Sequence, residues 1–165
     1  MRRMAEPVSL QTLLTYLTLI SVPIGVFYHI MTLRNQRRNR EASLLMQIHS
    51  QWTSGIRRNY GEIVRWEWDS YDDYMEKYGD LESQDKIGTV GGYIEGIGVY
   101  VREGLLPIRL VALFMSTPVI RFIEKFGPIA EENRVRKNAP RIGIEGEYLY
   151  KEIMKYLEEH PELKT

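Results

Sequence analysis

The chain has 165 residues, and its 22 Lys and Arg residues balance 22 Asp and Glu residues, so the formal net charge is zero. This length allows one domain with a modest core, and the neutral balance argues against a nucleic-acid partner. The absence of cysteine excludes disulfides, thiol catalysis and thiolate metal sites. No nucleotide or metal motif stands out, so we predict no cofactor.

The N-terminal segment from Val8 to Leu33 contains no Asp, Glu, Lys or Arg. As a helix with a rise of about 1.5 Å per residue it would extend roughly 39 Å, more than the ~30 Å hydrocarbon core of a bilayer. A cleaved signal peptide is the alternative. However, the apolar run is too long, and Tyr28 to Met31 occupy positions where small residues would mark a cleavage site. The sequence therefore predicts a retained transmembrane helix over 8–33, after a short tail over 1–7.

More arginines follow the apolar segment than precede it. Those after it are Arg34, Arg37, Arg38 and Arg40, and those before it are Arg2 and Arg3. Because cytoplasmic flanks carry more Lys and Arg, this bias predicts a cell-membrane protein with its N-terminus outside and its C-terminal domain in the cytoplasm. The four arginines of the basic juxtamembrane segment 34–41 are candidate contacts for anionic lipid headgroups, or they only set the topology.

Small and polar residues share one face of the predicted spanning helix, because they follow one another alternately four and three residues apart. The polar stripe consists of Gln11, Thr15, Thr18, Gly25, His29 and Thr32, with Val22 between them. Such residues at membrane depth often contact another helix, which predicts a homo-oligomer formed through the stripe. In the alternative interpretation, the hydroxyl groups bond back to their own helix and face lipid.

The remaining chain, from 42 to 160, has helical periodicity without sustained strand alternation, followed by a tail over 161–165. It predicts an all-α fold, in which the spanning helix continues into a small cytoplasmic helical bundle. The long helix should reach about Thr53, and Ser54 should cap a second helix that ends near Trp66. Both boundaries come from helix start and stop signals alone.

An acidic, aromatic stretch runs from Asp69 to Glu82. We expect a short helix over 71–78, stopped by Gly79. The carboxylates lack the spacing and the glycine of a calcium-binding loop. A solvated acidic surface is therefore preferred to a cation site.

A glycine-rich helix should follow, capped by Ser83. Gly88, Gly92 and Gly96 lie four residues apart on one face, and each costs a helix about 1 kcal/mol relative to alanine. Close approach of another helix would offset that cost, so these glycines are predicted to be helix-packing positions. Phosphate binding is the alternative, but the third glycine and the preceding strand of that motif are missing.

The C-terminal third predicts three helices. The first is apolar and covers 107–115. A second begins with Thr117 as its N-cap and Pro118 at its first position, and it ends near Lys137. A loop over 138–143 then leads to a last helix over 145–159, which Pro161 ends.

Three segments carry a resemblance to a known family. They are EASLLMQIHSQWTS at 41–54, GIGVYVREGL at 96–105 and FGPIAEENR at 126–134. Their order resembles a family of bacterial and archaeal membrane-anchored helical proteins described only as a domain of unknown function. The resemblance implies a helical domain behind a spanning helix, and it implies no reaction and no catalytic residues.

Three classes of function remain open. The anchor and the polar stripe favour a non-catalytic interaction or scaffold module, which acts through self-association or through an unidentified cytosolic protein. An enzyme at the membrane surface would use His49 with Glu41 or another carboxylate, although a lone histidine needs a positioned partner. An oligomeric pore or membrane-disrupting effector is the third class.

Overall fold

The computed structural model describes residues 9–163. Within that range the chain forms helices and no strand, which confirms the predicted all-α class. The predictions for Arg2, Arg3, Val8 and the tail over 1–7 lie outside the described residues, as do the last two residues of the C-terminal tail. The chain divides into two compact units, with the boundary between Ala42 and Ser43.

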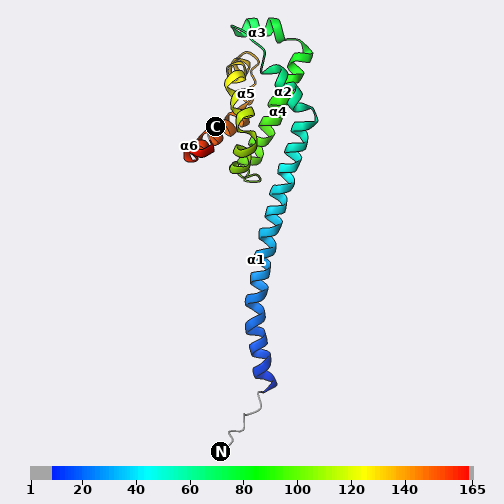
Figure 1. Cartoon of the computed structure of the whole chain (residues 1–165), viewed down its shortest axis with the longest axis vertical. Coiled ribbons are helices and arrows are strands. Elements are labelled where there is room, and N and C mark those ends of the chain that lie inside the picture. The colour runs from blue at the N-terminus through cyan, green and yellow to red at the C-terminus, as the bar shows by residue number, and fades with distance from the viewer. Residues whose placement is uncertain (1–8, 164–165) are drawn as a thin grey trace, which may run out of the picture. The chain divides into compact units, whose positions relative to one another are not determined.

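The first unit is the N-terminal part of α1 (Leu10–Gln51), drawn as one uninterrupted ribbon from blue to cyan (Figure 1). The predicted continuation of the apolar segment into a long helix is therefore confirmed. Among the residues that the structure describes, this is the one helix long and apolar enough to cross a membrane, and none of its apolar window is buried.

The transition from α1 to α2 (Arg57–Ile63) is one turn of π-helix, η1 (Trp52–Ile56). Ser54 donates from its hydroxyl to the carbonyl of Gln51 at 3.0 Å, inside this turn. Gly55 has a φ of 157°, a conformation that glycine alone adopts easily. The prediction that Ser54 caps a new helix was therefore wrong, because the π-helical turn carries the chain through without a capped start.

α3 (Tyr71–Tyr78) has the predicted bounds, and Ser70 is its N-cap. α4 (Leu81–Arg102) begins two residues earlier than a Ser83 cap would require. The carboxylate of Asp80 accepts a hydrogen bond from the backbone N–H of Ser83 at 3.0 Å. Ser83 is thus the residue that Asp80 caps, and the Ser83 prediction was wrong because a stronger acceptor stands three residues before it.

α5 (Ile108–Arg136) is one helix where two were predicted, so Thr117 is not an N-cap. Pro118 removes a backbone donor inside it, which typically costs about 3 kcal/mol. Met115, Val119 and Phe122 surround this point and are at most 6% exposed. Each such buried side chain contributes about 1.5–3 kcal/mol, so packing outweighs the local defect.

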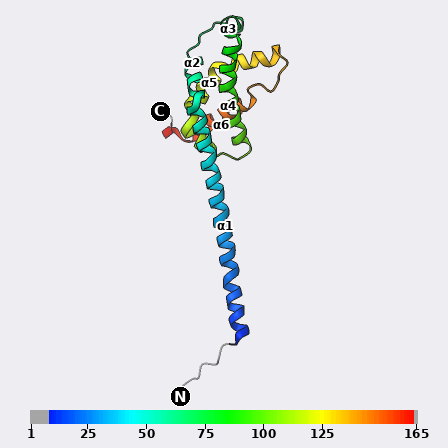
Figure 2. The same ribbon diagram turned by 90° about the vertical axis from the view of Figure 1, so that its right-hand side faces the viewer.

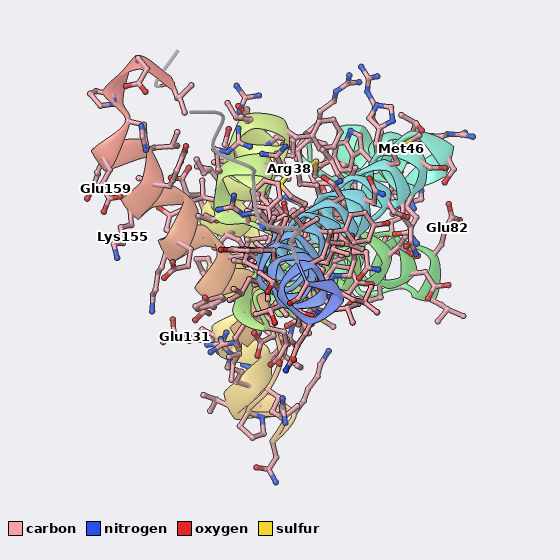
Figure 3. The ribbon with its side chains drawn as sticks, turned by 90° about the horizontal axis from the view of Figure 1, so that it is seen from below. Arg38, Met46, Glu82, Glu131, Lys155 and Glu159 are labelled. Atoms are coloured by element: carbon pink, nitrogen blue, oxygen red, sulfur yellow. The ribbon has the colours of Figure 1, made fainter. Side chains whose placement is uncertain are left out.

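α6 (Ile144–Glu159) confirms the predicted last helix, and η2 (Pro161–Leu163) follows it. α4, α5 and α6 lie side by side in both views (Figure 1 and Figure 2). Their facing side chains form most of the core of the second unit: Val90, Ile94, Ile97, Val111, Met115, Val119, Leu149 and Ile153. Charged side chains such as Glu131, Lys155 and Glu159 point outward from α5 and α6 (Figure 3).

The closest approach between α4 and α6 occurs at Gly98. A Cβ added there would lie 2.8 Å from the carbonyl carbon of Glu145. At Gly88, Gly92 and Gly96 an added Cβ would meet no neighbouring atom within 4 Å. The prediction that these three glycines admit another helix was therefore wrong for the described chain, because their face of α4 points away from the α6 contact.

We predict that Gly98→Ala lowers the free energy of unfolding by about 1–3 kcal/mol, because the new methyl group overlaps the backbone of α6. Gly96→Ala is the matched control on the same helix, and it should raise the stability by roughly 0.5–1 kcal/mol. Chemical unfolding of the full chain in detergent measures both values. Effects of the same sign would contradict the assignment of the contact to Gly98.

Candidate functional site: an apolar cavity walled by glycine

A cavity of about 230 Å³ lies within the second unit, between α4, α5 and the start of α6. Its walls are formed mainly by large apolar side chains: Ile87 and Ile94 of α4, and Phe122, Ile123, Phe126 and Ile129 of α5. Tyr74 of α3 also lines it. Cavities with this kind of lining are the usual places where proteins bind small apolar groups.

Six of the 13 glycines of the chain line this one cavity. They are Gly88, Gly91, Gly92, Gly127, Gly143 and Gly146. Gly88 and Gly92 come from the stripe singled out by its spacing, whereas Gly96 does not line the cavity. The wall along α4 is therefore largely backbone, and the missing side chains leave space that no other part of the described chain fills.

The polar groups on the α3 side of the cavity are already paired. The amide nitrogen of Gln84 donates to the hydroxyl of Tyr74 at 3.1 Å and to the carbonyl of Tyr78 at 2.7 Å. The hydroxyl of Tyr71 donates to the side-chain oxygen of Asn133 at 2.9 Å. Over residues 9–163 no buried side-chain nitrogen or oxygen lacks a partner. The cavity therefore offers no unpaired group that would require a polar ligand.

Two carboxylates also line the cavity, Glu95 from α4 and Glu147 from α6. Glu147 accepts a hydrogen bond from the guanidinium of Arg134. Arg134 in turn donates to the carbonyl of Ile142 at 2.6 Å, which ties α5 to the loop before α6. These two carboxylates place negative charge beside an otherwise apolar space.

Aromatic rings from the acidic stretch support the α3 side of the cavity. Trp68 packs on Tyr74 and Phe126, with ring centroids 5.2 and 5.3 Å apart. Trp66 stacks on Tyr78 at 4.2 Å with nearly parallel rings. The aromatic side chains of this stretch thus pack inward, while most of its carboxylates are exposed. The described residues hold no group of three acidic or histidine side chains arranged for a metal ion.

The threonines of the polar stripe bond within α1. Their hydroxyl groups donate to the carbonyls of Gln11, Leu14 and Tyr28 at 2.8–2.9 Å, from Thr15, Thr18 and Thr32 respectively. This matches the alternative in which hydroxyl groups satisfy their own helix. It leaves each oxygen able to accept a further hydrogen bond, so self-association stays a prediction.

The remaining candidate residues do not form a reactive site. The four juxtamembrane arginines are exposed, and Arg37 donates to Glu41 at 2.9 Å. The exposed ring of His49 packs against Phe114, with centroids 5.2 Å apart. Within the described chain no carboxylate is hydrogen-bonded to His49, so the structure adds no support for a catalytic pair.

Fold and cavity together define an all-helical protein with one membrane-length apolar helix and a small helical domain. The chain belongs to the family described as Domain of unknown function (DUF4760), whose model matches residues 19–153. The match confirms the resemblance to a family without an assigned function, and it covers the acidic stretch as well. Comparison with curated proteins and with solved structures gives no match.

The cavity could not be located from the sequence, because no single residue type marks it. The available signal was the energetic cost of three helical glycines, which indicated some compensating role on that face of α4. Phe122 and Phe126 were assigned to a buried helix face, and nothing in their spacing placed them opposite the glycines.

Tyr74 provides a test of burial beside the cavity. Burial raises the pKa of its hydroxyl above the ordinary tyrosine value, and the hydrogen bond from Gln84 partly opposes this shift. The folded chain therefore keeps a proton that the unfolded chain releases. The free energy of unfolding should be steady below about pH 10 and fall as the pH rises above it.

We predict that Tyr74→Phe makes this alkaline loss of stability smaller. At neutral pH the same change should cost about 0.5–1.5 kcal/mol, through the lost hydrogen bond with Gln84. Denaturant unfolding of both chains on either side of the tyrosine pKa measures the two effects. Identical slopes against pH for the two chains would show that Tyr74 is not shielded from water.

Proposed function

We propose that this protein is a single-pass protein of the cell membrane, in which α1 spans the bilayer and the helical domain acts in the cytoplasm as a non-catalytic interaction module. The observation that carries the proposal is the exposed apolar surface of α1. Between Leu10 and Leu33, fifteen large apolar side chains are exposed, by 42–76%. Soluble monomers rarely expose apolar patches above a few hundred Å², so such a surface is expected to lie in lipid.

The arginines after the span support an orientation with the domain inside. Cytoplasmic flanks are enriched in Lys and Arg, and Arg34 to Arg40 contain four of them. Their exposed guanidinium groups are also suited to anionic headgroups, each contributing up to about 1 kcal/mol near a charged leaflet.

Because the chain has no cysteine, single cysteines report the orientation directly. Ser9→Cys lies before the span, and Ser54→Cys lies at an exposed position after it. We predict that a membrane-impermeant maleimide labels the first in intact cells and the second only after the membrane is opened. Labelling of the Ser54 variant in intact cells would reverse the proposed orientation.

The polar stripe supports assembly through α1. Gln11 and His29 carry side-chain donors, and the threonine oxygens can still accept. Gly25 leaves space on the same face, since no atom of the described chain lies within 4 Å of an added Cβ. Hydrogen bonds between membrane helices contribute about 0.6 kcal/mol each on average, so several per helix suffice for weak association.

We predict that changing Thr18 and Gly25 together to Leu weakens this association, because it removes both a polar contact and the close approach of two helices. The control changes Leu14 and Leu17, which lie off the stripe, to Ile. Energy transfer between labelled copies in native membranes is the measurement. A signal that both double variants leave equal, or a monomeric wild type, would exclude the stripe as the interface.

A further inference from the structure

We propose that the cavity between α4, α5 and α6 binds the end of a hydrocarbon chain, as carried by membrane lipids and fatty acids. This inference rests on the proposed function, because attachment to the bilayer keeps the domain beside a reservoir of such chains. The inference adds a ligand class to the interaction module. It assigns the cavity-lining glycines a role that helix packing does not explain.

The size of the cavity fits part of a chain. At about 230 Å³ it exceeds the ~150 Å³ of an engineered apolar cavity that binds benzene. It is smaller than the roughly 300–1,000 Å³ of pockets that enclose whole drug-sized ligands. A chain end can therefore enter, whereas a complete lipid cannot.

The chemistry of the walls favours hydrocarbon over a polar ligand. Phe122, Ile123 and Phe126 present apolar surface, and the polar groups of Gln84 and Asn133 are occupied by tyrosine hydroxyls. A polar ligand would lose its hydration without gaining new hydrogen bonds, which is unfavourable. A hydrocarbon chain loses only contact with water, and about 25 cal/mol is gained for each Å² buried.

The carboxylates beside the cavity determine which end of the ligand enters. Glu95 and Glu147 line it, and an anionic headgroup would be repelled by them at close range. The methyl end of the chain carries no charge and meets no such penalty. The headgroup is therefore expected to stay outside the cavity.

The glycines of α4 fit this role by position. Gly88 and Gly92 could each accept a Cβ without a clash, and alanine would favour the helix by about 1 kcal/mol at each position. A methyl group there would instead take up volume in the cavity. The cost of glycine is thus offset if that volume is occupied by a ligand.

Photolabelling of the full chain in phosphatidylcholine vesicles tests the proposal. Two probes carry a diazirine at the methyl end of the chain, one a phospholipid and the other a free fatty acid. Peptides from α4 and α5 that line the cavity should be labelled by at least one probe, and the probe that labels identifies the source of the chain. Gly92→Leu, which fills the cavity, should abolish this label. Gly96→Leu is the matched control, because it adds the same side chain on α4 outside the cavity, and it should keep the label.

Peptides from α1 provide an internal reference, since a spanning helix is labelled by both probes in every variant. Unlabelled α1 peptides would overturn the proposed function. Labelled α1 peptides with unlabelled cavity peptides would overturn the present proposal alone. Equal loss of cavity label in the Gly92 and Gly96 variants would also overturn it.

Folding and a protein occupant are controlled separately. The unfolding midpoint of each variant is measured, and Gly88→Ala, a smaller filling, should reduce the label if Gly92→Leu proves unstable. Disulfide crosslinking of two copies through Gly92→Cys, without label in the cavity, would identify a second chain as the occupant and overturn the proposal.

Discussion

The apolar side chains of α1 must be removed from water, and the described chain supplies no protein surface that does so. From Leu10 to Leu33 they project from every side of one helix, so no single packing partner could cover them. At about 25 cal/mol for each Å² of apolar surface, exposure to water would be far more costly than the few kcal/mol by which a small domain is stable. A bilayer surrounds a helix on all sides, and it then confines the attached domain to the membrane surface.

The helical domain uses glycine in two different ways. Gly98 allows the backbone of α6 to approach α4, and Gly146 faces Ile123 and Ile94 at the same contact. Gly88 and Gly92 instead lie on a face without neighbours and leave the cavity open. The first pair stabilises the domain through packing, whereas the second pair costs stability. Such a cost is expected where a functional site requires empty space.

Local signals in the sequence were sufficient to predict α1, α3 and α6, because apolar periodicity and end signals agreed there. They failed at Pro118, where burial of neighbouring side chains overrides a strong helix breaker. They also failed at Ser54, because nothing local specifies a π-helical turn. The cavity depends on which residues of three helices face one another. That information is tertiary, so spacing within α4 indicated the special face but not what lay opposite it.

Depth measurements along α1 test the central claim, that this helix lies in lipid. Spin labels attached to single cysteines from Leu13 to Leu33, in the full chain in vesicles, report accessibility to oxygen and to a water-soluble nickel complex. Oxygen accessibility should peak near Val22 and fall toward both ends of the segment, with the nickel complex showing the reverse. A uniformly high accessibility to the nickel complex along the helix would show that α1 lies in water and would contradict a membrane-spanning role.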